Sequence, residues 1–201
     1  MTDRFLFGII IDDTIIKNSE AKWREKDRKK IKGLVSGSNL PHHAQRSEKK
    51  TNAYCLMTNH VHLLLETGYI EIGKFMKYMS ECYAIYYNHK YGYRGHVFES
   101  RYKSCLVKED AYFLQTSRYI HLNPVKAQMA DYPEDYLWSS YRTMIGIADD
   151  GITEKKKTLA YFPKNSIYQY REFVEDIGHK YIVQEQHIRK MIGEDELWLP
   201  W

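Results

Sequence analysis

The most constraining feature of the sequence is a pair of short apolar runs at residues 53–57 and 60–66. Two residues separate the runs, and a connection of this length between strand-like segments is typical of a β-hairpin. Side chains alternate along a strand, so His60 and His62 project from one face while their neighbours project from the other. The chain is therefore expected to contain an antiparallel sheet with one core face and one face that carries two imidazoles.

Helical and extended patterns lie on both sides of this hairpin. Apolar residues recur at three- and four-residue steps between residues 72 and 90, which predicts an amphipathic helix. A second helix is expected from Asp110, a good N-cap, to Asn123, because Pro124 disfavours continuation. The other expected elements are a strand at 5–11, a charged helix at 20–34 capped by Asn18 and Ser19, a loop at 42–50, an extended segment at 96–108, a short helix at 139–145 and a helix that begins at Ser166.

The charge of the chain is unevenly distributed. Residues 1–130 carry 21 basic and 13 acidic side chains, whereas residues 131–201 carry 9 and 13. The basic part can attract a polyanion, or it can be an ordinary solvated surface. With 43% hydrophobic residues among 201, the chain can bury the core of a single domain.

Neither a membrane span nor a disulfide framework is expected. The longest apolar run, at residues 5–11, is too short to cross a bilayer. Cys55, Cys82 and Cys105 are odd in number and form no C-x-x-C pair, which favours reduced thiols over disulfides or a zinc site. Together these features favour a cytoplasmic protein.

Two pairs of residues are candidates for chemistry. Neutral imidazole is a common metal ligand, so His60 and His62 can bind a divalent cation or can be polar residues on a half-exposed sheet face. Tyr119 and Asn123 are four residues apart, which would place a phenol and an amide one turn apart on one helix face. A helical tyrosine is more often a packing residue, and the chain has 18 tyrosines. The residue pattern alone therefore does not select Tyr119.

Four segments of the chain form an ordered set of motifs: residues 52–66 (NAYCLMTNHVHLLLE), 95–104 (GHVFESRYKS), 117–127 (SRYIHLNPVKA) and 132–141 (YPEDYLWSSY). Together they resemble the single-tyrosine HUH transposases, especially the REP-associated tyrosine transposases of bacteria, which are IS200-like. HUH denotes histidine, a hydrophobic residue and histidine. Four matches in the family's order are hard to obtain by chance.

The resemblance implies an α+β fold of the HUH endonuclease type, with a ferredoxin-like (RRM-like) antiparallel sheet and helices on one face. It makes His60 and His62 ligands of Mg²⁺ or Mn²⁺, Asn123 the third ligand and Tyr119 the nucleophile. Related enzymes place glutamine at the Asn123 position. Such enzymes act as transposases that nick and rejoin single-stranded DNA through a 5′-phosphotyrosyl intermediate.

The partner that the resemblance implies is single-stranded DNA, often folded as a hairpin beside the cleavage site. Arg94, Arg101 and Lys103 are expected to pair with phosphates and Tyr102 to stack on bases, unless they form an ordinary exposed sheet face. The resemblance favours a bacterial cytoplasmic protein, nucleoid-associated when bound to DNA. Related enzymes include monomers and homodimers that exchange the tyrosine helix, so both arrangements stay open.

The resemblance covers about residues 52–145, the expected transposase core. Residues 1–51 lack the Tyr-His strand and the Arg-Gly-Asn turn with which the family usually opens, so they are expected to form a divergent strand, helix and loop. Residues 146–201 are expected to be a helical tail. Two alternatives remain: a catalytically degenerate module that binds single-stranded nucleic acid, and a metal hydrolase that uses water and leaves Tyr119 structural.

Overall fold

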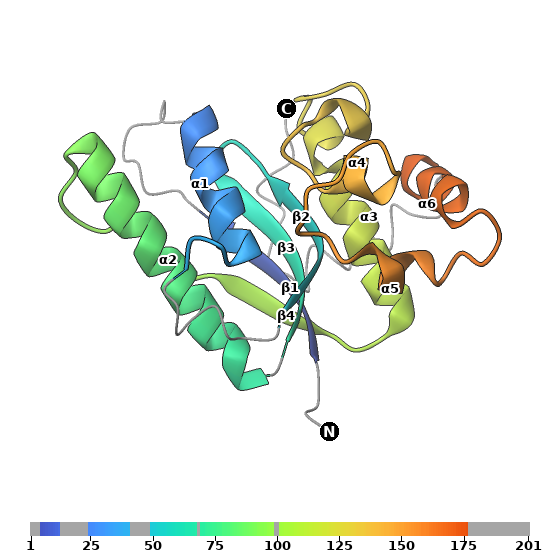
Figure 1. The fold of residues 1–201 in the computed structure, drawn as a ribbon, viewed down its shortest axis with the longest axis horizontal. Helices are drawn as coiled ribbons and strands as arrows, with labels where there is room; N and C mark the ends of the chain where they lie inside the picture. The colour runs from blue at the N-terminus through green and yellow to red at the C-terminus, as the bar shows by residue number, and fades with distance from the viewer. Residues whose placement is uncertain (1–4, 13–23, 41–48, 68, 99–100, 177–201) are drawn as a thin grey trace.

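A four-stranded antiparallel sheet lies at the centre of the protein, between two layers of helices (Figure 1). The structure is a computed structural model that describes residues 5–12, 24–40, 49–67, 69–98 and 101–176. The strands, in the spatial order β2-β3-β1-β4, are β1 (Phe5–Asp12), β2 (Lys50–Leu56), β3 (His60–Thr67) and β4 (Lys103–Val107). The expected α+β fold and the expected hairpin are therefore confirmed.

Helices cover both faces of this sheet. α1 (Glu25–Ser36) and α2 (Tyr69–Tyr91) lie on one face, as expected, and α3 (Asp110–Lys126) adds a layer on the other (Figure 1). The remaining helices gather beside α3: η1 (Pro133–Asp135), α4 (Tyr141–Met144), α5 (Lys155–Leu159) and α6 (Ser166–Glu175). No helix within the described ranges is both long and apolar enough to span a membrane.

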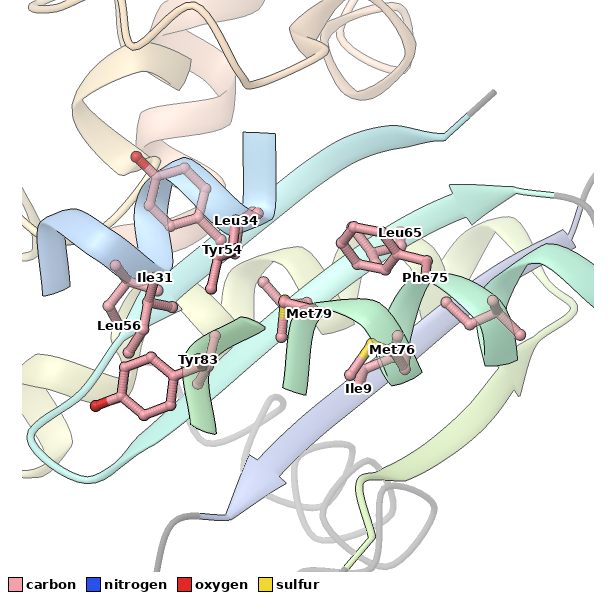
Figure 2. Packing of buried hydrophobic residues seen from close by; sticks show 14 of the residues in the cluster. Ile9, Ile31, Leu34, Tyr54, Leu56, Leu65, Phe75, Met76, Met79 and Tyr83 are labelled. Atoms are coloured by element: carbon pink, nitrogen blue, oxygen red, sulfur yellow. The ribbon is translucent and has the colours of Figure 1, made fainter. Parts of the chain in front are cut away.

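A buried apolar cluster fills the space between the sheet and the pair α1 and α2 (Figure 2). β3 contributes Leu63 and Leu65, which alternate with residues of the opposite face, and α2 contributes Phe75, Met79 and Tyr83 at four-residue steps. Fully burying a side chain of this kind contributes about 1.5–3 kcal/mol. The residues whose spacing predicts α2 are thus the residues that face the sheet.

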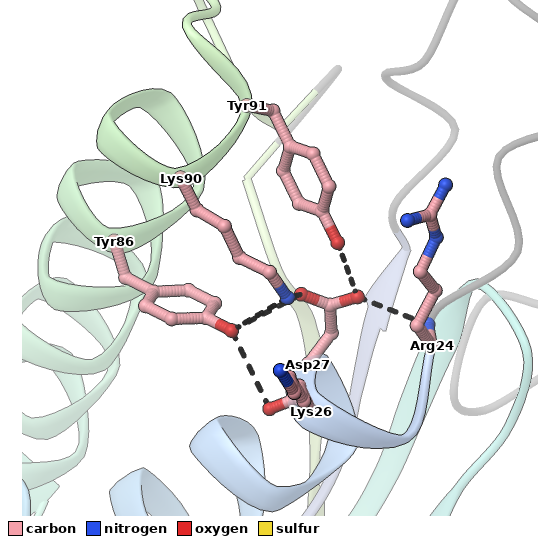
Figure 3. Close-up of polar contacts among 6 residues, drawn as sticks. All are labelled: Arg24, Lys26, Asp27, Tyr86, Lys90 and Tyr91. Carbon is pink, nitrogen blue, oxygen red and sulfur yellow. Dashed lines mark hydrogen bonds and ion pairs between the residues drawn. The ribbon is translucent and has the colours of Figure 1, made fainter.

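A buried carboxylate joins the start of α1 to the end of α2 (Figure 3). Asp27 accepts hydrogen bonds from Lys90 Nζ at 2.7 Å and from Tyr91 Oη at 2.8 Å. The Tyr86 hydroxyl donates to the same carboxylate at 3.3 Å, and the Arg24 backbone N–H does so at 3.0 Å. Burial alone would raise the pKa of Asp27, but the bonds from Lys90 and Tyr91 hold that pKa below its usual value. The cluster fixes the two helices to each other.

The segment that follows η1 covers the outer edge of β2. The Leu56 N–H donates to the Trp138 carbonyl at 2.9 Å, and the Ser140 N–H donates to the Tyr54 carbonyl at 3.0 Å. An edge strand presents unpaired backbone groups, and this short pairing satisfies some of them. It also ties the chain beyond α3 to the same sheet that holds β3.

Several expected boundaries differ from the observed ones. α1 begins at Glu25 and not near residue 20, and its expected caps Asn18 and Ser19 lie outside the described residues. Residues 41–48 of the expected loop lie outside them as well, and Lys50 already belongs to β2. The expected extended segment contains one strand within its described part, β4.

The end of α3 was predicted wrongly. The helix continues through Pro124 to Lys126, whereas Asn123 was expected to be its last residue. Proline removes one N–H from the helix ladder, but the Ala127 N–H still donates to the Asn123 carbonyl at 2.9 Å. The last turn is therefore held together, and it carries Lys126 one turn beyond the expected end.

Candidate active site

The histidine pair lies on β3, an internal strand of the sheet, at the end next to the hairpin turn. The rings of His60 and His62 are edge-on to each other, with centroids 4.7 Å apart. Asn59 Oδ1 is 2.9 Å from His60 Nδ1, which fixes the orientation of that ring. The sequence predicts the shared face correctly, but that face is covered by α3 and His62 is only 1% exposed. Both faces of β3 are therefore buried.

Tyr119 is the residue of α3 that reaches this histidine face. Its ring is edge-on to His62, with centroids 5.8 Å apart and an interplanar angle of 86°. Tyr119 is 3% exposed and belongs to the apolar cluster between α3 and the sheet, together with Phe113 and Ile120. α3 thus brings a phenol beside the imidazole pair from a distant part of the sequence.

Asn123 follows Tyr119 by one turn on the same face of α3. It is 7% exposed, and its Nδ2 atom is buried without a hydrogen-bond partner among the described residues. The two ends of an amide are interchangeable by a half-turn rotation, so this position can present either Nδ2 or Oδ1. A buried amide with unused hydrogen-bonding capacity suits a ligand that binds there.

The donor set of two imidazoles and one amide oxygen suits a divalent cation such as Mg²⁺ or Mn²⁺. The described part of the chain contains no group of three or more His, Cys, Asp or Glu side chains placed to hold a metal. On this face, His60, His62 and the Asn123 amide are residues whose chemistry fits a divalent cation.

Lys126 is a candidate residue that the sequence analysis did not identify. Its Nζ atom lies 5.4 Å from the centre of the Tyr119 ring, a cation-π geometry. The signal was present in the sequence, because a residue seven positions after Tyr119 returns to the same helix face. It went unnoticed because α3 was expected to end before it.

The four expected DNA contacts lie at different places. Arg94 is exposed beyond the end of α2, and Arg101 is exposed just before β4. Tyr102 is half-buried and packs against the cluster beneath α1 and α2. Lys103 and His62 are in register with the same residue of β1, Ile10, so their side chains project from the same face of the sheet.

His121 lies between Tyr119 and Asn123 in sequence but points away from the histidine pair. It is completely buried, and its ring nitrogens are 2.7 Å from Tyr170 Oη and 2.7 Å from Ser140 Oγ. Burial lowers the pKa of His121 to about 3, so the ring is neutral. Its hydrogen bonds agree with the structural role that its position on the helix suggests.

An antiparallel sheet that carries a histidine pair, with a helix that brings a tyrosine to it, places the protein in the HUH class of fold. A family model described as "Transposase IS200 like" matches residues 16–123, which is more than half of the chain. The chain belongs to this family, and the resemblance seen in the sequence is confirmed. The match includes both histidines, Tyr119 and Asn123, and it begins inside the segment expected to be divergent.

Comparison with solved structures supports the same fold. The chain is similar to the "Structure of the REP associates tyrosine transposase bound to a REP hairpin", with a TM-score of 0.55 and 13% sequence identity. The similarity covers 76% of this chain and 86% of that one. Comparison with curated proteins gave no significant match.

Proposed function

We propose that the protein nicks and rejoins single-stranded DNA, with Tyr119 as the nucleophile and a divalent cation at His60, His62 and Asn123. The observation that carries this proposal is the edge-on contact of Tyr119 with His62 at 5.8 Å, in a chain of the IS200-like transposase family. The contact places a phenol beside a pair of imidazoles on one buried face. Together they suit attack on a phosphodiester.

The proposed reaction is an exchange of phosphate esters. The Tyr119 hydroxyl loses its proton and its oxygen forms a bond to phosphorus while the bond from phosphorus to the 3′ oxygen breaks. The 3′ oxygen takes up a proton, so the departing strand leaves with a 3′-hydroxyl. The DNA then remains attached to Tyr119 through its 5′ phosphate. Attack by another 3′-hydroxyl reverses the step and joins new ends, so the ester energy is conserved without ATP.

Three other features are proposed to assist the attack by Tyr119: the divalent cation, the helix α3 and Lys126. A bound divalent cation would neutralise charge at the attacked phosphate. The helix α3 holds the phenol in one orientation, because positioning of the attacking group lowers the barrier substantially. Lys126 adds a positive charge beside the Tyr119 ring, where a phosphate would approach.

The proposed path of the DNA uses exposed cations, of which Lys103 lies on the histidine face of the sheet. Lys103 projects from the same sheet face as His62 and suits contact with a phosphate beside the cleavage site. Arg94 and Arg101 suit contacts with more distant phosphates, and the half-buried Tyr102 suits stacking of a base on the exposed part of its ring. The related transposase structure is described as bound to a REP hairpin, so a hairpin-containing single strand is the proposed substrate.

The proposed boundaries of the core, residues 52–145, leave β1 and α1 outside it. Both elements nevertheless belong to the sheet and its first helix layer. We therefore propose that residues 146–201 are the auxiliary part. The described portion of that part packs against α3 through Tyr170 and Val174 of α6.

The experiment incubates the protein with Mn²⁺ and end-labelled hairpin oligonucleotides from its own genomic flanks. A denaturant-resistant protein-DNA adduct in the wild type that is absent in Tyr119→Phe supports the proposal. Salt-sensitive binding with no adduct favours the degenerate binding module. Cleavage without an adduct that persists in Tyr119→Phe favours the water-using hydrolase.

A further inference from the structure

His121 is a buried polar residue of α3 that the proposed reaction does not use. It is two residues from Tyr119 and two from Asn123, and both of its ring nitrogens have partners on other elements. Nδ1 is 2.7 Å from the Tyr170 hydroxyl on α6, and Nε2 is 2.7 Å from the Ser140 hydroxyl beside β2. One side chain thus links the helix to both of its neighbours.

One arrangement of protons makes every contact of this network a hydrogen bond when the His121 ring is neutral. Ser140 Oγ donates to the Tyr54 carbonyl at 3.2 Å and accepts from the Tyr54 N–H at 2.9 Å. A hydroxyl has one proton, so in this arrangement Ser140 accepts from His121 Nε2–H. His121 Nδ1 then accepts from the Tyr170 hydroxyl. The Tyr170 oxygen in turn accepts from Ser117 Oγ at 2.8 Å.

This network ends on the strand next to the histidine pair. Tyr54 belongs to β2 and is in register with Leu63, the residue that follows His62 on β3. His121 is therefore connected to β3 in three steps. Its ring contacts the Ser140 hydroxyl, that hydroxyl bonds to the backbone of Tyr54, and Tyr54 pairs with Leu63 of β3. The link between α3 and α6 has a second bond, because Arg118 Nε donates to the Phe173 carbonyl of α6 at 2.8 Å.

We propose that His121 is a positioning residue that, as the Nε2–H tautomer, locks α3 to β2 and so sets the place of Tyr119 and Asn123. This inference rests on the proposed function. A buried hydrogen bond contributes only about 1 kcal/mol to folding. A displacement of about 1 Å at a reacting group, in contrast, can slow a reaction about 100-fold. The bond to Ser140 should therefore matter more to the reaction rate than to stability.

The test compares Ser140→Ala with Ser139→Ala. Ser139 is a buried neighbour whose hydroxyl accepts from the Tyr141 N–H at 3.2 Å, so its loss also removes one hydrogen bond. Single-turnover adduct formation at saturating DNA, the Kd for DNA and the Tm are measured for both. Ser140→Ala is expected to slow adduct formation about tenfold or more with Kd within about twofold. Ser139→Ala is expected to keep the wild-type rate at a similar loss of Tm.

A conservative substitution at His121 distinguishes a positioning role, which needs the ring N–H, from a packing role, which needs only the volume of the side chain. His121→Gln retains an N–H that can reach Ser140, whereas His121→Leu does not. The glutamine variant is expected to recover most of the rate that the leucine variant loses. Equal slowing in Ser140→Ala and Ser139→Ala, or equal loss in both His121 variants, would overturn the inference.

A spectroscopic measurement keeps the inference testable even if no adduct forms. Nitrogen-15 shifts of the His121 ring are expected to report the Nε2–H tautomer in the wild type. Amide hydrogen exchange in α3 is expected to accelerate in Ser140→Ala and not in Ser139→Ala. An Nδ1–H tautomer, or unchanged exchange, would reject the positioning role. Absence of an adduct in the wild type would instead count against the proposed function.

Discussion

The ring of Tyr119 on α3 meets the ring of His62 on β3 edge-on, with centroids 5.8 Å apart, within a single chain. Two anchors maintain this contact. The segment around Ser140 pairs with β2, and α6 holds α3 from its other side. Because both rings belong to one chain, a single chain can hold both the proposed nucleophile and the proposed histidine ligands. Several predictions depend on this geometry.

The first prediction concerns whether the site is shared between chains. Because Tyr119 lies beside His62 of its own chain, a mixture of His62→Ala and Tyr119→Phe proteins should form no adduct. The measurement is adduct formation by the mixture, with each variant alone and the wild type as controls. Adduct in the mixture would mean that one chain supplies the helix and another supplies the histidines.

Metal binding should depend on the amide of Asn123. Asn123→Ala is expected to weaken Mn²⁺ binding about tenfold or more, whereas Asn123→Gln, which keeps the amide oxygen, should lose less. Electron paramagnetic resonance titration of Mn²⁺ measures this without DNA. Asn88→Ala on α2 is the control, since its amide bonds to Gly95 on the other side of the sheet. Equal Mn²⁺ affinity in all three variants would remove Asn123 from the ligand set.

Lys126 should contribute a phosphate contact. Each phosphate contact on a single strand adds about 0.7 to the slope of log K against log salt, so Lys126→Ala should reduce that slope by about this amount. Fluorescence anisotropy across a salt series measures the slope. Lys77→Ala is the matched control, because Lys77 is exposed on α2 and pairs with Glu81. If Lys126→Ala and Lys77→Ala change the slope by the same amount, Lys126 makes no phosphate contact and only packs against the Tyr119 ring.

The carboxylate of Asp27 should stabilise the fold in a pH-dependent way. Its pKa is lower in the folded protein than the value near 4 of an unfolded chain. The stabilisation is therefore complete above about pH 4 and is lost as the pH falls through the folded pKa. Asp27→Asn is expected to cost about 2 kcal/mol at pH 7, the value of a charged buried hydrogen bond, and less at about pH 3, below the unfolded pKa.

Urea unfolding of the Asp27→Asn variant at the two pH values provides the measurement. Glu25→Gln on the same helix is the control, because Glu25 forms an exposed i,i+4 pair with Lys29 and should matter little. A difference between wild type and Asp27→Asn that does not shrink in acid would show that Asp27 acts through packing and not through its charge.

Local patterns in the sequence predicted the elements that carry the site. Alternation along residues 60–66 predicted that His60 and His62 share a face, and the steps between Phe75, Met79 and Tyr83 predicted α2. Both patterns depend on strand or helix periodicity alone, which is readable from neighbours in sequence. The position of Tyr119 required the family resemblance, because 18 tyrosines share its chemistry.

The features that the sequence did not predict depend on contacts between distant segments. The burial of His62 arises from α3, and the hydrogen bonds of the His121 ring arise from Ser140 and Tyr170. Lys126 was missed because Pro124 is tolerated in the last turn of α3. The features of His62 and His121 require knowledge of which elements pack together, whereas Lys126 lies on the face that helix periodicity predicts once α3 continues past Pro124.

The measurement that tests the central claim most directly identifies the amino acid attached to DNA. The adduct formed with Mn²⁺ and a hairpin oligonucleotide is digested with protease and nuclease, and the modified peptide is sequenced by mass spectrometry. A nucleotide joined through its 5′ phosphate to Tyr119, with a free 3′-hydroxyl on the released strand, is the predicted result. Attachment to any other residue, or attachment through a 3′ phosphate, would contradict the account.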